Sequence, residues 1–385
     1  MQGGERVPID AQQVDAPLSQ FAVFLVMTAA DGDGALATVR EVVSGIDDLV
    51  KTVGFRDLNG HLSCVVGIGR ELWDRLSPGA RPSELHPFPA VAGAVHAAPS
   101  TPGDLLFHIR AERQDLCFEF ERLLLDQLGD AASVVDETQG FRYFDARDLL
   151  GFVDGTANPI GAELPEMTLI GDEDPDFAGG SYVVVQKYLH DLDAWSRLST
   201  AEQEAVIGRT KLDNVELDDA PGPQFAHKTL ATIAGDDGEE LQILRDNMPF
   251  GRPGQGEFGT YFIGYSRRLW VIQLMIHRMF IGQPAGYHDK ILDVSQAVTG
   301  TTFFAPSNPV LRGLADESAA SDAASAPAFP SDRAAWAATT AGPATAAKPA
   351  MTAEPVRTAE PAASAEPAAT AEAAASAEPG TDGPG

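Results

Sequence analysis

Short apolar runs alternate with amphipathic stretches over the first 314 residues of the chain. The run "FAVFLVMTAA" at 21–30 is continuous and rich in bulky apolar residues, which predicts a buried strand. In the stretch 34–53, Val42, Ile46 and Leu49 recur at the three-to-four spacing of an amphipathic helix. Strand and helix follow each other again in "SYVVVQKYLHDLDAWSRL", which begins at residue 181. The pattern therefore predicts a repeated unit that contains both strands and helices.

Two longer segments resemble each other. "GDLLFHIRAERQDLCFEFERLLLDQLG" begins at residue 103, and "GTYFIGYSRRLWVIQLMIHRMFIGQPAG" begins at residue 259. Each starts with glycine and continues with a short apolar strand, a basic break and an amphipathic helix. At an offset of 156 residues, Leu105 aligns with Tyr261 and Leu124 aligns with Phe280. Similarity at a fixed offset indicates a duplicated structural unit.

The order of elements in each half is strand, helix, one or two strands, and then strand and helix again. This order is typical of a ferredoxin-like unit, in which helices cover one face of an antiparallel sheet. We predict an α+β protein with two tandem ferredoxin-like units, over 1–150 and 151–314, each an antiparallel sheet covered by helices. From residue 315 the chain is rich in Ala, Pro and Glu and has few large apolar residues. The segment 315–385 is therefore predicted to be a disordered tail.

The chain is strongly acidic, with a formal net charge of −29. This charge excludes a nucleic-acid-binding protein, which needs a basic surface, and binding to an anionic membrane. Cys64 and Cys117 lie in separate apolar runs, so they form neither a zinc site nor a disulfide framework. The N-terminus lacks the pattern of a secretion signal, and the run at 21–30 is too short to span a bilayer. These features predict a cytoplasmic protein with no nucleic-acid or membrane partner.

A carboxylate lies between two glycines in "GFVDGTANP", residues 151–159. Gly151 and Gly155 indicate unusual backbone angles or a close approach of another group near Asp154. Asp-Gly and Asn-Pro are also ordinary turn pairs. The motif is therefore either a plain turn or a turn that holds Asp154 for chemistry.

Further candidate residues follow in the second half. His227 in "FAHKTL" comes after a stretch rich in Gly and Pro, and its imidazole suits a metal ligand, a base or a structural hydrogen bond. In "ILRDNMPFG", Arg245 and Asn247 are two residues apart and share one face of an extended segment. A guanidinium beside an amide forms a donor-rich surface for an oxygen that develops negative charge. An ordinary surface strand end remains the alternative.

Charged residues near these motifs are weaker candidates. Arg209 in "IGRTKLD" is either a partner of a carboxylate or a solvated side chain. Asp289 and Asp293 in "GYHDKILDVSQ" are four residues apart and are expected to share a helix face. Either carboxylate suits the N-terminus of a helix or the orientation of a buried histidine.

The order of these residues resembles that of the dye-decolorizing peroxidases, a haem family, and most closely its bacterial type B. The resemblance covers roughly residues 8–314. "GFVDG" matches the GxxDG motif of the family, and His227, the "RDN" segment and "GTYFIGY" at 259–265 follow in the family's order. The family also contains two ferredoxin-like units.

The resemblance implies one haem b per chain, bound in the C-terminal half. It makes His227 the proximal ligand of the iron and Asp289 the carboxylate that accepts the other imidazole N–H. It places Arg209 against a haem propionate. Asp154, Arg245 and Asn247 are expected on the distal side, where peroxide reacts.

The resemblance implies a peroxidase that reduces hydrogen peroxide to water through an oxoferryl state and oxidises small reducing substrates, such as dyes, phenolic compounds or Mn²⁺. A haem-handling protein, which carries haem or releases its iron, and a non-catalytic ferredoxin-like binding module remain alternatives. A homo-oligomer is expected. Some type B relatives carry a short C-terminal peptide for loading into an encapsulin shell. The tail shows no matching segment, so encapsulation stays open.

Overall fold

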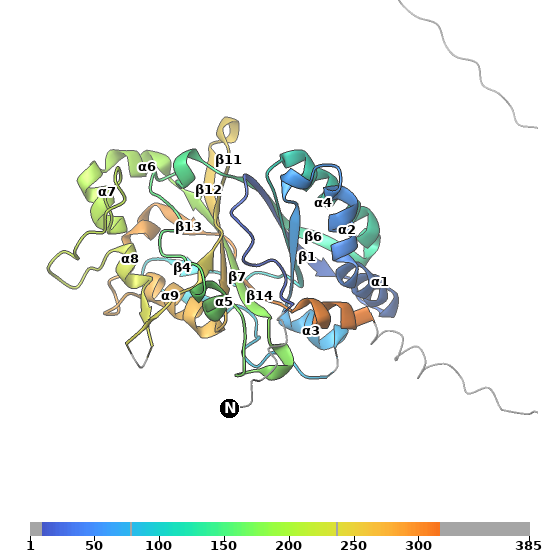
Figure 1. Cartoon of the computed structure of the whole chain (residues 1–385). Coiled ribbons are helices and arrows are strands. Elements are labelled where there is room, and N and C mark those ends of the chain that lie inside the picture. The colour runs from blue at the N-terminus through green and yellow to red at the C-terminus, as the bar shows by residue number, and fades with distance from the viewer. Residues whose placement is uncertain (1–9, 78, 236–237, 316–385) are drawn as a thin grey trace, which may run out of the picture. The chain divides into compact units, whose positions relative to one another are not determined.

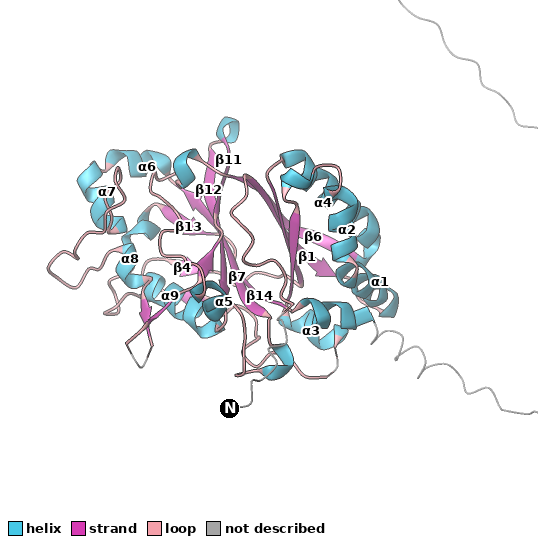
Figure 2. Ribbon diagram, viewed as in Figure 1, coloured by secondary structure: helices cyan, strands magenta, loops and turns pink. Residues whose placement is uncertain are grey.

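Figure 1 presents the computed structural model of the chain, which describes residues 10–77, 79–235 and 238–315. Strands form the interior and helices lie on the outside, as Figure 2 shows. The prediction of an α+β protein with antiparallel sheets covered by helices is confirmed. The predicted disordered tail lies outside the described residues, apart from its first residue.

The N-terminal half begins with strand β1 and ends with strand β6. Its elements are β1 (Phe21–Ala29), α1 (Asp33–Ser44), α2 (Ile46–Gly54), η1 (Leu58–Gly60), β2 (Ser63–Ile68), α3 (Arg70–Leu76), β3 (Val91–Ala92), β4 (Ala97–Ala98), β5 (Leu105–Ala111), α4 (Gln114–Leu128), η2 (Gly129–Ala131) and β6 (Ala132–Phe141).

The C-terminal half repeats this plan with insertions. Its elements are η3 (Phe144–Ala146), α5 (Glu163–Thr168), η4 (Pro175–Phe177), β7 (Ser181–His190), α6 (Leu192–Arg197), α7 (Thr200–Ile207), α8 (His227–Leu230), β8 (Ile233–Ala234), β9 (Glu240–Leu241), β10 (Leu244–Arg245), β11 (Met248–Arg252), η5 (Pro253–Gln255), β12 (Glu257–Ser266), α9 (Leu269–Ile281), η6 (Lys290–Asp293), β13 (Ser295–Ala297) and β14 (Thr301–Ala305).

The two halves use the same strand order. In the N-terminal half the order is β2-β5-β1-β6, and in the C-terminal half it is β10-β12-β7-β14. When only these four strands of each half are numbered in chain order, both sheets have the order second, third, first, fourth. This is the strand order of a ferredoxin-like unit. All of these pairs are antiparallel. Phe304 of β14 pairs with Ile68 of β2, so the two sheets continue into one another.

The helix predicted at 34–53 is two helices, α1 and α2, which meet at Gly45. The last i→i−4 hydrogen bond of α1 runs from the backbone N–H of Gly45 to the carbonyl of Glu41. The apolar positions on both sides of the break still face the core, because Val42, Ile46 and Leu49 are all buried. The periodicity therefore predicted the buried face correctly and missed the break.

The duplication is real, but the offset of 156 is one residue too long. Arg113 is the N-cap residue of α4, and Arg268 is the N-cap residue of α9. Their separation along the chain is one residue shorter than the predicted offset. The consequence is visible in the strands. Phe107 faces the helices, whereas Ile263, its partner at offset 156, faces the space between the two sheets. A slip of one residue moves a strand side chain to the opposite face.

The apolar core has two main parts. One lies between each sheet and its helices and includes Phe120 of α4 and Met275 of α9. The other lies between the two sheets and includes Phe24, Tyr261 and Phe303. Both cysteines are buried and unpaired. Within the described residues, no helix combines the length and the apolar character needed to cross a membrane.

Candidate active site

The "GFVDGTANP" segment is a tight turn. Gly151 and Gly155 have φ values of 93° and 75°, which are left-handed conformations that favour glycine. The backbone N–H of Asp154 donates to the carbonyl of Ala146 at 2.9 Å. The N–H of Gly155 donates to Oδ1 of Asp154 at 2.7 Å. The turn therefore fixes both the backbone and one carboxylate oxygen of Asp154.

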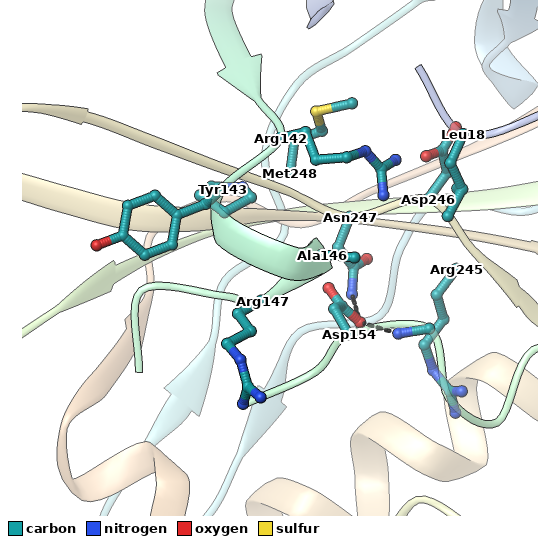
Figure 3. Close-up of a pocket in the computed structure, with 12 residues that line it drawn as sticks. Leu18, Arg142, Tyr143, Ala146, Arg147, Asp154, Arg245, Asp246, Asn247 and Met248 are labelled. Carbon is teal, nitrogen blue, oxygen red and sulfur yellow. Dashed lines mark hydrogen bonds between the residues drawn. The ribbon is translucent and has the colours of Figure 1, made fainter. Parts of the chain in front are cut away.

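Asn247 holds Asp154 from the neighbouring strand region. Oδ1 of Asn247 accepts the backbone N–H of Ile263 at 3.1 Å, which fixes the orientation of the amide. Nδ2 of Asn247 then donates to Oδ1 of Asp154 at 3.3 Å. Figure 3 shows these two side chains pointing toward each other. Both hydrogen bonds to Asp154 use Oδ1, so Oδ2 is the carboxylate oxygen that is left for a ligand.

Arg245 belongs to the short strand β10, which ends one sheet. Its backbone N–H donates to Oδ1 of Asn158 at 2.9 Å, and its carbonyl accepts from Nδ2 of Asn158 at 2.7 Å. The amide of Asn158 thus pairs with Arg245 as a neighbouring strand would. Nη2 of Arg245 lies 3.9 Å from Sδ of Met275 in α9. The prediction from sequence missed Asn158, although it lies four residues after Asp154 in the same motif.

Asp246 is a second residue that the sequence did not single out. It points to the opposite side from Arg245 and Asn247 and is buried. Its Oδ2 accepts from Nη1 of Arg110 at 2.9 Å, and Arg110 belongs to β5 of the N-terminal half. Nε2 of His108 lies 3.9 Å from the same oxygen. Alternation along an extended segment places Asp246 opposite its neighbours, but a single sequence gives no indication of the partner on β5.

His227 begins the short helix α8. Its Nδ1 donates to Oδ2 of Asp289 at 2.7 Å, which leaves Nε2 as the ring nitrogen available to a ligand. Asp289 is fully buried, whereas 33% of the His227 side chain is exposed. Burial is nevertheless the largest effect on the pKa of His227 and lowers it, because protein surrounds the ring on its other sides. The charge and hydrogen bond of Asp289 outweigh burial and raise the pKa above its usual value.

Asp289 and Asp293 do not share a helix face, so that expectation was wrong. Asp289 precedes the short 3-10 helix η6 and caps it by accepting the N–H of Ile291. A 3-10 helix has three residues per turn, which turns residues four apart away from each other. Asp289 therefore faces His227, whereas Asp293 is 44% exposed on the other side.

Charged groups of the site influence one another. Burial is the largest effect on the pKa of Asp154 and raises it, although Asn247, Gly155, Arg245 and His227 act in the opposite direction. Burial lowers the pKa of Arg245, although the carboxylate of Asp154 opposes this effect. Arginine remains a cation under these conditions. The site therefore combines a permanent positive charge with a carboxyl group that takes up a proton more easily than an exposed one.

Arg209 lies in a loop beside the site. Its guanidinium donates to Oδ1 and to the backbone carbonyl of Asn214, and it forms an ion pair with Glu216. Asn214 in turn donates to Oγ1 of Thr156 in the turn that carries Asp154. The predicted contact of Arg209 with a haem propionate is not tested by these partners and stays a prediction.

Figure 3 shows a pocket beside Asp154 and Arg245. It lies where the two halves meet. Its lining residues are Leu18, Arg142, Tyr143, Ala146, Arg147, Asp154, Gly155, Arg245, Asp246, Asn247, Met248 and Pro249. The three side chains predicted for the peroxide side, Asp154, Arg245 and Asn247, therefore line a common pocket with Asp246, whereas His227 and Asp289 form a separate pair.

The donor set fits an iron porphyrin. A histidine whose Nδ1 is bound to a buried carboxylate presents Nε2, which is the usual arrangement of a histidine that ligates a metal. Asp154 and Arg245 also act on the pKa of His227, which the charge of Arg245 lowers and that of Asp154 raises. A histidine nitrogen together with an aspartate and an arginine is a set of side chains that suits a haem centre that handles peroxide.

Comparison with known proteins supports this assignment. Models of Dyp-type peroxidases match the chain over 11–142 for the N-terminal part and 145–309 for the C-terminal part. A dye-decolorizing peroxidase of Mycobacterium tuberculosis is 56% identical over 299 residues, which are 77% of this chain and 88% of that protein. The chain belongs to the dye-decolorizing peroxidase family.

Solved structures agree with the sequence relatives. DyPB from Rhodococcus jostii RHA1 is 60% identical, with a TM-score of 0.77 over 80% of this chain and 99% of that one. The encapsulated DyP-type peroxidase from Mycobacterium smegmatis is 54% identical, with a TM-score of 0.76 over 79% of this chain and 98% of that one. Structures of the R. jostii protein include variants of an aspartate and an arginine in complex with heme, and a variant of an asparagine in complex with manganese.

The predicted family, fold class and cofactor are therefore confirmed: the protein is a haem-dependent peroxidase of type B, an oxidoreductase that acts on peroxide. This result overrides the alternatives of a haem-handling protein and of a non-catalytic binding module. The two family models meet between residues 142 and 145. The predicted domain boundary at residue 150 stays a prediction.

Proposed function

We propose that His227 is the axial ligand of the haem iron and that Asp289 sets the charge of its imidazole. The support is the hydrogen bond of 2.7 Å between Nδ1 of His227 and the fully buried Asp289. A buried carboxylate that accepts the Nδ1 proton makes the opposite ring nitrogen a stronger donor to a metal. Because the cap of η6 also holds Asp289, the imidazole keeps one orientation.

Asp154, Arg245 and Asn247 are proposed to form the side of the site where peroxide reacts. The three positions varied in the R. jostii structures are an aspartate, an arginine and an asparagine with the same sequence spacing as these residues. The common pocket around the three side chains is the observation that carries this proposal. It places a cation, a carboxylate and an amide donor around one small space.

Each side chain has its own task in the proposed reaction. The haem iron, when bound, supplies the site at which peroxide is coordinated and reduced. Oδ2 of Asp154 takes the proton from one peroxide oxygen and returns it to the other, and the raised pKa of this group makes the carboxylate a stronger base for the first transfer. The guanidinium of Arg245 stabilises the negative charge that develops as the O–O bond lengthens. Asn247 is a positioning residue, because it holds Oδ1 of Asp154 and leaves Oδ2 free.

The test is the rate of the peroxide step in the haem-loaded protein, followed by stopped-flow absorbance. We expect Arg245→Leu to slow this step by about 100-fold or more, the usual effect of losing one charge-stabilising donor. Asn247→Ala, which keeps both charged groups, is the matched control and should have the smaller effect. An unchanged rate in Arg245→Leu, together with a slow Asp154→Asn variant, would show that the step depends on proton transfer by Asp154 and not on charge stabilisation by Arg245.

Association with a protein shell is a weaker proposal. The M. smegmatis relative, whose sequence is 54% identical, was solved as an encapsulated enzyme. We propose that this chain is also a candidate for encapsulation, and the test is co-purification of the full chain with a shell protein from its own source. Recovery of the chain free of any shell would contradict it. The predicted homo-oligomer and the predicted cytoplasmic location stay predictions.

A further inference from the structure

A second cluster of metal-binding side chains lies on the exposed side of η6. It consists of His96, His288 and Asp293, whose ligand atoms all lie within 4.8 Å of one another. Nε2 of His96 lies 2.9 Å from Oδ1 of Asp293, and Nε2 of His288 lies 2.8 Å from the same oxygen. The two imidazole rings contact each other edge to face, with centroids 4.8 Å apart. The sequence assigned no role to either histidine.

We propose that His96, His288 and Asp293 bind one divalent transition-metal cation, with Zn²⁺ as the best match, at a site separate from the haem. Two imidazoles and one carboxylate are a donor set that suits zinc and its neighbours in the first transition row. An oxygen-only site would suit Mg²⁺ or Ca²⁺, but two of the three donors here are nitrogens.

The distances require only a small adjustment. Bonds of about 2.0–2.2 Å to zinc place tetrahedral ligand atoms about 3.3–3.5 Å apart. The two N–O distances are about half an ångström shorter than this, and every donor–donor distance is at most 4.8 Å. Each donor atom therefore moves by less than about 1 Å when the cation enters. His96 lies in the turn of a two-strand hairpin, and turns allow shifts of this size.

The cluster is open to a metal and to water. The side chains of His96 and Asp293 are 25% and 44% exposed, whereas His288 is mostly buried. Three protein ligands leave a fourth position of a tetrahedral site for water. Lys290 forms an ion pair with the other oxygen, Oδ2 of Asp293, at 3.2 Å. Oδ1 is therefore the oxygen available to the cation.

Without a cation, the same contacts form a hydrogen-bonded network in which both Nε2 atoms donate to Asp293. When a cation enters, the proton on each Nε2 moves through water to Nδ1 of the same ring, so both imidazoles stay neutral, and coordinate bonds replace the two hydrogen bonds. The competing interpretation is thus a network that binds nothing. A metal site binds one cation per chain, whereas the hydrogen-bonded network alone binds none, and this difference can be measured directly.

The proposed metal site lies next to the segment that carries Asp289, the partner of His227. His288 directly precedes Asp289, the partner of His227, and its carbonyl accepts from Nε2 of Gln224, three residues before His227. His96 belongs to the hairpin of β3 and β4, where Gly93 lies so close to the carbonyl of Phe280 in α9 that a side chain would not fit. A cation would cross-link this hairpin to the segment that carries Asp289.

The experiment uses the haem-loaded full chain, so that His227 is occupied, after treatment with a chelator. Zinc is titrated by calorimetry in excess Mg²⁺, which saturates the acidic surface. We expect one zinc per chain, with affinity lower by at least about 100-fold in His96→Ala and in Asp293→Asn, because even indirect partners of a metal change affinity by 10–100-fold. His86→Ala removes an exposed histidine from another region and should bind zinc as the parent does.

X-ray absorption at the zinc edge reports the ligands of zinc without a contribution from iron, and it does not depend on enzyme activity. Two imidazoles with oxygen ligands are expected in the parent, and one imidazole in His96→Ala. Absence of a one-to-one zinc complex in the parent, or equal affinity in His96→Ala and His86→Ala, would overturn the proposal. Thermal unfolding of the parent should shift upward with zinc, and the shift should be lost in Asp293→Asn.

Discussion

The second strand of each ferredoxin-like unit, β2 or β10, occupies the same position in its sheet. The two strands differ in length and in burial. In β2 all six residues of "SCVVGI" are buried, and the strand lies between β5 and β14. In β10 only two residues pair, and the strand lies at the end of the sheet order. The outer edges of the two strands have different neighbours: β14 pairs with β2 at one position, Ile68, while the corresponding edge of β10 faces the Asp154 turn and Asn158.

This comparison shows how one duplicated unit acquires a site. The backbone of β2 is bound by β5 on one edge and, on the other, by one pair with β14 and by the side-chain amide of Gln12, which binds both backbone groups of Val66. An edge strand must find other partners, and Asn158 provides them for Arg245. The residues after β10 are then free to carry Asp246 and Asn247 in opposite directions. The N-terminal unit has mostly apolar side chains along β2, whereas the C-terminal unit has polar side chains of the pocket at β10 and directly after it.

The largest effect is expected from His227→Ala, which removes the proposed axial ligand from the C-terminal unit. The variant should lose haem binding or hold haem much more weakly, because no other side chain takes the place of Nε2 beside Asp289. The measurement is the Soret absorbance and the haem-to-protein ratio after reconstitution. His86→Ala should retain full haem. A stoichiometric complex with an unchanged spectrum in His227→Ala would remove this residue from the site.

Asp246→Asn tests the connection between the two units. It leaves Arg110 buried without its anionic partner, and breaking such a pair costs about 3–5 kcal/mol. Denaturant unfolding of the haem-free protein measures this change in the free energy of unfolding. Asp126→Asn is the control, because it breaks an exposed ion pair with Arg122 that contributes less than about 1 kcal/mol. Equal losses in the two variants would contradict the role of Asp246.

Glu121→Gln tests the apolar unit, because Glu121 of α4 corresponds in the repeat to the buried apolar residue Ile276 of α9. Burial is the main reason that the pKa of Glu121 rises to about 7, with Glu137 adding to it. A carboxyl whose folded pKa is raised destabilises the fold as pH rises from about 4.5 to about 7. Glu121→Gln should therefore gain about 1–3 kcal/mol at pH 8 and almost nothing at pH 4.

Thermal and denaturant unfolding across this pH range measure that gain. A gain that is independent of pH would assign the effect to packing rather than to the charge of Glu121. The opposite pH dependence would contradict the burial argument itself.

Asn158→Ala is expected to have the smallest effect. It removes two hydrogen bonds to the backbone of Arg245, each of which contributes about 0.5–1.5 kcal/mol. The backbone N–H of Arg245 should then exchange with solvent faster, as measured by hydrogen exchange. The amide of Val184 in the central strand β7 serves as the internal reference. Equal protection of Arg245 in the variant and the parent would show that β10 does not depend on Asn158.

The sequence predicted the parts of the site that lie in local patterns. Asp154 is flanked by glycines, and Arg245 and Asn247 are two residues apart on an extended segment, so their direction follows from alternation. The sequence pattern offered Asp289 and Asp293 equally, and the family resemblance selected Asp289. The partners of Asp246 and Arg245 were out of reach, because Arg110 and Asn158 belong to segments whose position depends on the whole fold. The duplicated unit was predicted, but a register error of one residue reversed the strand faces.

Asn158 also matters for the protein in crowded solution. The long sheet ends at β10, and open sheet edges recruit strands from other molecules. Asn158 occupies both backbone hydrogen-bonding groups of Arg245, so a foreign strand finds no partner at that position. The amide that helps to set the active site thereby also protects the molecule from edge-to-edge aggregation.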